Sequence, residues 1–266
     1  MPTTRWPMLL VTLPVLLGPH VVGGPNASSA AGEQTGTDTA GATRAFAAPE
    51  AHQAAAACDD FFYAITNRVV AKYARDDGRR VALSDGPAKH LNSGFFWEGR
   101  LYCAHSNYPA TPEQSQVMVL DPETMRLTVE HDFGDFGGSL TWVIRNADGW
   151  WCNFAYYGAD NARTYLVQMD DDWRELRRFR YPERLIRGLG RYSVSGGIWD
   201  DGRLLVTGHD DRLLFELRLP GEGDELEYVD RHPVPFTGQG IARDPRTGGL
   251  VGIDRGRRLV IFAPLP

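Results

Sequence analysis

The chain has 266 residues, of which 42% are hydrophobic and 23% charged, so it can bury a sizeable core in one large domain or two small ones. Its net charge is −6 and its pI is near 5.6. A mildly acidic chain has no electrostatic attraction to the phosphates of DNA or RNA, so we do not expect a nucleic-acid-binding protein. Only Lys72 and Lys89 accompany 26 arginines (28 cationic residues less 2), a bias typical of GC-rich bacterial genomes.

The first 30 residues predict a signal peptide. Arg5 precedes the apolar run "PMLLVTLPVLLG", which is too short and too interrupted by proline to span a bilayer. The small residues of "NASSA", ending at Ala30, suit a cleavage site. Residues 31–52 are rich in Ala, Gly and Thr and predict a flexible lead-in to a folded domain over residues 53–266. We therefore expect a protein exported to the periplasm or beyond, with no transmembrane span.

The chain contains three cysteines, Cys58, Cys103 and Cys152, so at least one thiol is unpaired. No Cys-x-x-Cys or Cys/His spacing typical of zinc sites is present. Cys103 and Cys152 fall in the middle of predicted strands, where cysteine behaves as a small hydrophobic residue. This favours buried free thiols over a disulfide, although a disulfide remains an alternative.

An internal repeat organises the remainder of the chain. Four segments share a small or polar start, an apolar strand, a tight turn with glycine and a second apolar strand; they read "NSGFFWEGRLYCAHSN", "SLTWVIRNADGWWCNFAYY", "SVSGGIWDDGRLLVTGHDD" and "TGQGIARDPRTGGLVGIDRG". Glu-Gly and Asp-Gly between apolar runs are strong hairpin signals because glycine supplies the positive φ of the turn. A third and a fourth strand follow each of the first three hairpins.

The repeat predicts an all-β fold, a five-bladed β-propeller of four-stranded antiparallel blades. The segment starts are separated by 48, 54 and 44 residues. The predicted blades cover residues 53–86, 90–134, 138–182, 192–236 and 237–266. The last blade lacks an outer strand, and we expect a strand from residues 43–57 to complete it and close the ring. A two-sheet β-sandwich and a blade count of four or six remain alternatives, and the one expected helix covers residues 182–190.

Several short blocks resemble a known class of protein. "KHLNSG", "LYCAHSNYP", "SGGIW", "TGHD" and "GQGIA" are similar to the recurring blocks of secreted bacterial β-propellers of the strictosidine-synthase-like, gluconolactonase-like and cycloisomerase-like kind. The resemblance covers about residues 60 to 260. It implies a propeller fold and no particular reaction, because propellers carry unrelated functions.

In a propeller, the loop that enters the first strand and the loop that joins the second strand to the third lie on the same face. Aligning the blades on their turns predicts a pocket at one end of the central channel. The predicted ligand-binding residues are His90, Asn92, Ser93, Asn107, Thr141, Tyr156, Ser195, Gln239 and Arg255. For any single hydroxyl or amide among them, satisfying a backbone turn is the more ordinary role, whereas the whole set together with the histidines favours a pocket. Tyr156 suits stacking on a sugar ring or packing in the core.

Three histidines map to the same end and support two interpretations. In one, His90, His105 and His209 bind a divalent metal through three protein ligands and one open position. In the other, His105 or His209 is a general acid or base, with Asp254 orienting the imidazole. Asp210 is expected to point away from His209 because neighbours on a strand face opposite sides. Arg255 is expected to bind a substrate carboxylate.

These features predict an exported, monomeric propeller that binds a small polar ligand, a sugar or an organic acid. The catalytic interpretation is a lyase, lactonase or isomerase that uses histidine acid–base chemistry, with or without a metal. The alternative is a non-catalytic propeller scaffold that binds a glycan or a protein.

Overall fold

The structure, a computed structural model, describes residues 43–266. This part of the chain is built of β-strands, with one short α-helix, α1 (Glu183–Leu189), and one 3-10 helix, η1 (Gly158–Arg163). The predicted all-β class is confirmed, and α1 falls inside the segment where a helix was expected. The predicted signal segment and residues 31–42 of the lead-in lie outside the described residues.

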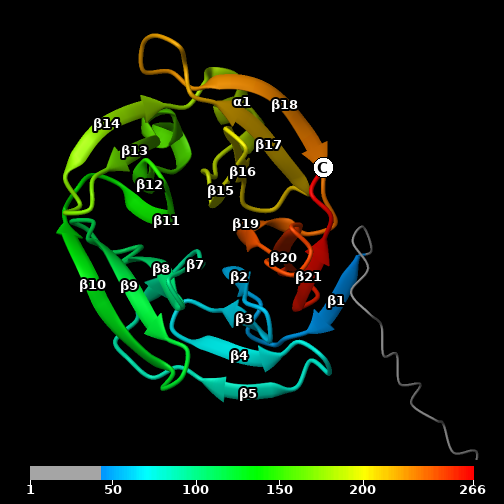
Figure 1. Ribbon diagram of the computed structural model, residues 1–266. Coiled ribbons are helices and arrows are strands. Elements are labelled where there is room, and N and C mark those ends of the chain that lie inside the picture. Colours follow the sequence, from blue (N-terminus) through cyan, green and yellow to red (C-terminus); the bar gives the residue numbers. More distant parts are fainter. Residues whose placement is uncertain (1–42) are drawn as a thin grey trace, which may run out of the picture. The chain divides into compact units, whose positions relative to one another are not determined.

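The strands are arranged around a common centre, and the first strand of each antiparallel set lies innermost (Figure 1). The first set is β2 (Ala54–Ala57), β3 (Phe61–Ile65), β4 (Val70–Ala74) and β5 (Arg80–Leu83). In the second set the inner strand is divided; it contains β6 (His90–Leu91), β7 (Phe95–Trp97), β8 (Arg100–Ser106), β9 (Ser115–Asp121) and β10 (Arg126–Gly134).

The later strands follow the same order from the centre outward. The third set is β11 (Ser139–Asn146), β12 (Gly149–Ala155), β13 (Tyr165–Met169) and β14 (Glu175–Arg180). The fourth is β15 (Gly196–Asp200), β16 (Arg203–Thr207), β17 (Leu213–Arg218) and β18 (Glu227–Pro233). The last strands of the chain are β19 (Thr237–Arg243), β20 (Leu250–Asp254) and β21 (Leu259–Ala263), and β1 (Arg44–Ala47) pairs with β21.

The hairpin turns explain why these segments form strands. Glu98 and Gly99 both have positive φ between β7 and β8, and Asp201 and Gly202 both have positive φ between β15 and β16. Two successive positive φ angles define the turn whose twist matches antiparallel strands, and glycine adopts them without steric cost. The hairpins predicted from "WEG" and "WDDG" are therefore confirmed.

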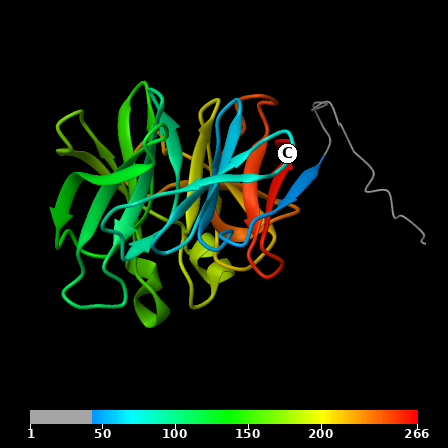
Figure 2. The ribbon, with the colours of Figure 1, turned by 90° about the horizontal axis from the view of Figure 1, so that it is seen from below.

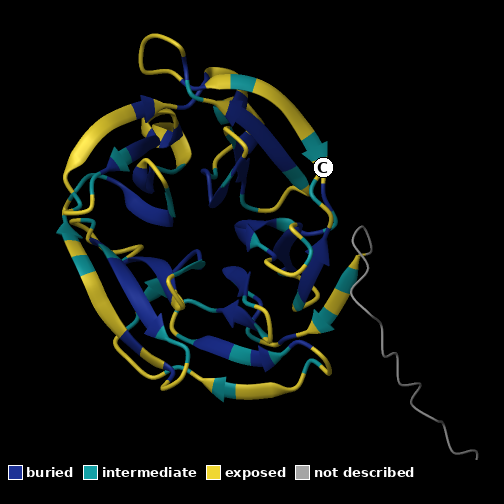
Figure 3. Ribbon diagram, in the orientation of Figure 1, coloured by how far each residue is buried: buried dark blue, intermediate teal, exposed yellow. Residues whose placement is uncertain are grey.

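The core lies between neighbouring sets of strands. Most inner and middle strands are largely buried, with β7 only partly so, while the outer strands β5, β10, β14 and β18 expose much of their surface (Figure 3). Trp142 and Trp151 are fully buried and pack with residues of the fourth set, as expected for large rings between sheets. Cys103 and Cys152 are buried free thiols within the core.

The innermost strands approach one another closely. A Cβ atom added at Gly240 of β19 would lie 2.6 Å from the Cβ of Ala54 and 3.0 Å from the Cα of Ser93. Three inner segments therefore meet at this point, and only glycine leaves room for them.

Each inner segment is tied to the next by hydrogen bonds that we call the inner belt. Three of these bonds come from side chains: Asn92 Nδ2 donates to the carbonyl of Leu140 (2.9 Å), Thr141 Oγ1 to that of Val194 (2.8 Å) and Thr207 Oγ1 to that of Gln239 (2.5 Å). Backbone amides supply the others, from Leu91 to the carbonyl of Asn67 (2.8 Å) and from Gly240 to that of Gln53 (2.9 Å). The belt thus joins every set of strands to its neighbour.

Two further contacts join the two ends of the described chain. Strand β1 pairs antiparallel with β21, from Arg44 opposite Phe262 to Ala47 opposite Leu259. Near β4, the buried guanidinium of Arg75 makes two hydrogen bonds, of 2.6 and 2.8 Å, to the buried carboxylate of Asp244. Burial disfavours the ionised Asp244, but hydrogen bonds from Arg75 and Thr247 outweigh it, so the pKa of this carboxyl lies below its usual range.

The connecting loops gather at the two ends of the strands, and η1 and α1 lie at one of these ends (Figure 2). No helix among residues 43–266 has the length and apolar character that crossing a membrane requires.

Replacing Arg75 with Met is expected to lower the free energy of unfolding by about 3–5 kcal/mol, because the carboxylate of Asp244 is left buried without its partner. Urea denaturation of the full chain measures this loss. The double variant R75M/D244L is expected to be clearly more stable than R75M. Arg187→Met is the matched control because Arg187 and Glu183 form an exposed pair on α1, and its expected loss is below about 0.5 kcal/mol. Equal losses in R75M and the control would contradict this account.

Candidate functional site

Four basic side chains meet at the amino-terminal ends of the inner strands. This histidine–arginine cluster consists of His52, His90, His209 and Arg255. Arg255 Nη1 lies 3.1 Å from His209 Nε2, and Arg255 Nη2 lies 3.1 Å from His52 Nε2. Arg255 and His90 also act on the pKa of His52, which indicates that all four groups are close together. Segments up to 203 residues apart in the sequence therefore contribute to one group.

The contacts of Arg255 fix the protonation of two imidazoles. A guanidinium has only donors, so Nε2 of His52 and Nε2 of His209 must both accept with a lone pair. Each of these rings is then neutral and carries its proton on Nδ1. Burial is the largest cause that lowers the pKa of His52, to about 4, and the charge of Arg255 is the next. The same two causes lower the pKa of His90.

His209 is held from several sides. The ring of Tyr192 stacks on it, with centroids 3.9 Å apart and planes 7° apart. Gln239 Nε2 donates to the backbone carbonyl of His209 at 3.1 Å. The carboxylate of Asp210 lies 2.8 Å from His209 Nδ1 but lacks the orientation of a hydrogen bond. A small rotation of the exposed Asp210 side chain would bring it onto the Nδ1 proton.

The expected pairing of His209 with Asp254 is not found. The carboxylate of Asp254 instead accepts hydrogen bonds from Arg212 Nη2 (2.7 Å) and from the backbone N–H of Arg257 (3.0 Å). Asp210 is the nearer carboxylate because residues 209 and 210 lie in the loop between β16 and β17, where the alternation of a regular strand does not apply. This corrects the roles predicted for the two aspartates.

Most of the predicted hydroxyl and amide ligands have structural contacts instead. Asn92 and Thr141 belong to the inner belt, and Gln239 bonds the backbone of Gly208 and His209. Ser195 Oγ donates to the carbonyl of Ser193 at 3.2 Å. Ser93 is 2% exposed, and its hydroxyl has no partner among residues 43–266. All five side chains are buried, and their predicted roles in ligand binding stay predictions.

His105 is not among the histidines that contact Arg255. Its Nε2 accepts the backbone N–H of Lys89 at 2.9 Å, and its ring is 5% exposed. Burial lowers the pKa of His105 to about 4, although the side chain of Gln116 acts to raise it. It lines a cavity of about 470 Å³ together with Lys89 and with Asn107, whose amide group bonds the backbone of residues 112 and 114.

The expected metal site is not supported by this arrangement. Among the described residues, no three side chains of His, Cys, Asp or Glu are positioned to hold a metal ion. The physical reason lies in the ring nitrogens, because the Nε2 lone pairs of His105 and His209 are already used by Lys89 and Arg255. His90 contributes to the cluster as a neighbour of Arg255 rather than as one of three ligands.

Tyrosines border the cluster on one side. Tyr108 lies between His90 and Tyr157, with 5.3 Å separating its ring centroid from that of each neighbour. Tyr156, by contrast, packs beneath the guanidinium of Arg163, 4.2 Å from its ring centroid. Sequence reasoning missed His52, Tyr108 and Tyr192. The scarcity of histidine was the only signal for His52, which was assigned to the lead-in.

Comparisons with known proteins support the fold. No family model matches the chain, and no curated protein matches it. The crystal structure of glutaminyl cyclase from Myxococcus xanthus superposes with a TM-score of 0.55 at 10% identity, over 82% of this chain and 93% of the cyclase. The WD40 repeats of RRP9 give a TM-score of 0.46 at 10% identity, over 86% and 99% of the two chains. Together with the four-stranded sheets, the likeness to the cyclase supports a β-propeller fold.

Protonation of His105 is expected to couple stability to pH. The unfolded chain binds this proton near pH 6.5 and the folded chain only near pH 4, so the contribution of His105 is complete above pH 6.5 and is lost as pH falls toward 4. His105→Gln keeps an acceptor for Lys89 but removes the titration. Urea unfolding between pH 7 and 4 is expected to show a fall in stability about 1–3 kcal/mol smaller in this variant than in the parent chain. Parallel curves would contradict the assignment.

Proposed function

We propose that this chain is an exported, monomeric five-bladed β-propeller that binds a small organic acid at the histidine–arginine cluster. The four-stranded sets β2–β5, β6–β10, β11–β14 and β15–β18 supply four blades, and β19–β21 with β1 supply the fifth. In this proposal residues 1–30 are the signal segment, residues 31–52 form the lead-in that provides β1, and residues 53–266 form the ring.

The pairing of β1 with β21 supports closure of the ring by the lead-in. The ring of Phe46 on β1 stacks on Phe62 of the first blade, with centroids 4.9 Å apart, and meets Phe262 edge-on at 6.0 Å. Strand β1 therefore contacts the first and the last blade together. It also covers the edge of β21, which would otherwise present unpaired backbone groups.

Phe46→Ala is expected to lower the free energy of unfolding by about 1–3 kcal/mol, because a half-buried ring that joins two blades is lost. Thermal or urea unfolding of the full chain measures the change. Val81→Ala on the exposed outer strand β5 is the control and is expected to stay within about 0.5 kcal/mol. A loss no larger than the control would argue against closure by β1.

The charge of Arg255 is the observation that carries the ligand assignment. Among the described residues no carboxylate lies within ion-pair distance of Arg255, although its side chain is half-buried. Two of its five N–H groups are used by imidazoles, and the others remain for a ligand. A carboxylate matches a guanidinium in charge and in geometry, so the cluster favours an organic acid over a neutral sugar.

An acid–base role for His209 follows from the same geometry. A carboxylate that binds Arg255 balances its charge and draws the guanidinium away from the imidazoles. The Nε2 lone pair of His209 then becomes a proton acceptor, and Asp210 stabilises the proton on Nδ1. This arrangement suits a lyase, lactonase or isomerase that moves one proton. The fold alone does not choose between such an enzyme and a binding scaffold.

Calorimetric titration with succinate, citrate, gluconate and glucose tests the ligand class. The parent chain is expected to bind at least one carboxylate and not glucose. Arg255→Gln is expected to weaken that binding by about ten-fold or more, the effect of losing a charge-assisted hydrogen bond. Arg257→Gln is the matched control, since Arg257 is an exposed neighbour outside the cluster. Carboxylate binding that survives R255Q, or binding of glucose alone, would refute the proposal.

A further inference from the structure

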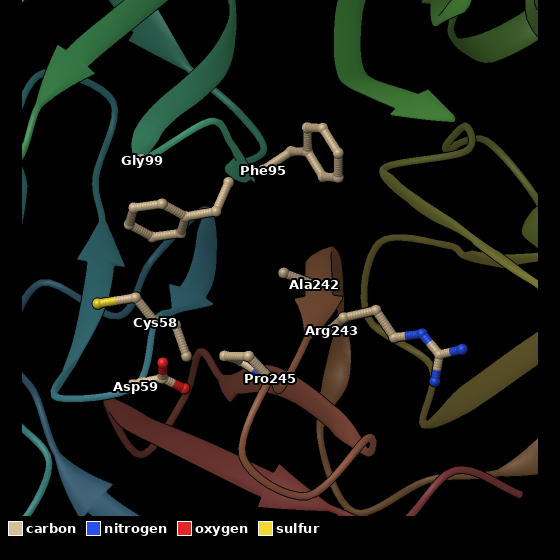
Figure 4. A pocket seen from close by; sticks show the side chains of 9 residues that line it. Cys58, Asp59, Phe95, Gly99, Ala242, Arg243 and Pro245 are labelled. Carbon is tan, nitrogen blue, oxygen red and sulfur yellow. The ribbon is translucent and has the colours of Figure 1, made fainter. Parts of the chain in front are cut away.

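A second concave site lies at the carboxyl-terminal ends of the inner strands. It is a cavity of about 290 Å³. Its lining residues are Ala57, Cys58, Asp59, Phe95, Phe96, Gly99, Ala242, Arg243 and Pro245. Figure 4 shows Phe95 on one side of the opening and Asp59 with Pro245 on the other. The volume corresponds to about ten water molecules at ~30 Å³ each, which is enough for one small organic ligand.

This cavity is separate from the histidine–arginine cluster. Strand β19 begins near the cluster, where Gln239 bonds the carbonyl of His209, and it ends at Arg243 in the cavity wall. The four strand steps from Gln239 to Arg243 span roughly 13 Å. A ligand in the cavity therefore does not reach Arg255.

The wall of the cavity is mainly apolar. Phe96 packs against Tyr63, with ring centroids 5.1 Å apart, and Phe95 stacks beside Trp97 at 6.3 Å. Phe95 and Phe96 are both only partly buried, although rings of this size gain most from full burial. Ala57 and Ala242 complete an apolar surface that suits an aromatic or other compact hydrocarbon body.

The charged side chains around the cavity differ in whether they have a partner of opposite charge. Arg243 has partners, because its guanidinium contacts the carboxylate of Asp200, which also pairs with Arg203, and donates to the carbonyl of Gly248. Asp60, next to the cavity, lies 3.7 Å from Arg246. Asp59 has no hydrogen bond or ion pair with any residue in the range 43–266. Among the described residues Asp59 is therefore the charged group of the cavity wall that lacks a partner, and its carboxylate complements a cation.

We propose that this cavity binds an aromatic amine, whose ring packs against Phe95 and Phe96 and whose ammonium group pairs with Asp59. The site is independent of the proposed organic-acid site and goes beyond it. An anionic aromatic compound of the same size is rejected by Asp59, and a neutral one loses the ion pair but keeps the apolar contact.

Cys58 provides a reporter for occupancy. It is half-buried in the cavity wall, whereas Cys103 and Cys152 are completely buried. The neutral reagent iodoacetamide therefore modifies Cys58 of the native full-length chain first. Its rate is measured alone and with phenethylamine, phenylacetate or 2-phenylethanol. Phenethylamine is expected to slow the modification about five-fold or more at saturation, and phenylacetate is expected to have no effect.

Matched variants separate the two parts of the site. Asp59→Asn is expected to raise the phenethylamine concentration needed for protection by about five- to ten-fold, while Asp60→Asn is expected to leave it unchanged. Phe95→Ala is expected to weaken binding of both phenethylamine and 2-phenylethanol. Thermal unfolding verifies that each variant is folded, and calorimetric titration of phenethylamine into the parent chain and D59N gives a second measurement that does not depend on Cys58.

Three results would overturn the proposal. The first is no protection and no calorimetric binding by phenethylamine. The second is equal protection by phenethylamine and phenylacetate, which would remove the role of charge. The third is unchanged affinity in D59N, which would remove the role of Asp59. Loss of carboxylate binding in R255Q has no bearing on these outcomes, because that variant alters the opposite end of the inner strands.

Discussion

The inner belt of hydrogen bonds is the constraint on which the rest of this structure depends. The inner strands converge on a small central space, so each must present small residues and must also satisfy backbone groups that face the next blade. Asn92, Thr141 and Thr207 meet this demand with side chains that donate to a neighbouring backbone carbonyl. A buried carbonyl left without such a donor would be costly, so these side chains also help to set the spacing between blades.

The inner strands carry different side chains at their two ends. Between these ends, β2, β19 and the segment at Ser93 approach one another closely around Gly240. Loops at the amino-terminal ends of the inner strands bring together basic and aromatic side chains, and turns at the other end leave an apolar cavity with one unpaired carboxylate. The two ends differ in charge as well as in polarity, which favours different ligands.

The sequence predicts the fold far better than the site. Turns such as Glu98–Gly99 have a local signature, and their recurrence revealed the sheets without any knowledge of long-range contacts. Thr141 shows the limit, because a threonine that donates to the next blade has the same sequence context as one that faces a ligand. His52 was missed because its place in the cluster depends on the meeting of chain segments 203 residues apart, which no local pattern records. Asp210 was misjudged because the strand ends before it.

Two arginines in different settings show how the cluster differs from a buried ion pair. Arg75 is buried and fully balanced by Asp244, with hydrogen bonds of 2.6 and 2.8 Å, so its charge is resolved within the fold. Arg255 is half-buried, contacts two neutral imidazoles and has no anion among the described residues. Imidazole lone pairs accept from two of its five N–H groups but cannot cancel its charge, and after burial this charge is the next cause that lowers the pKa of His52. An anion bound to Arg255 would relieve both effects together, and this is the physical basis of the proposed organic-acid site.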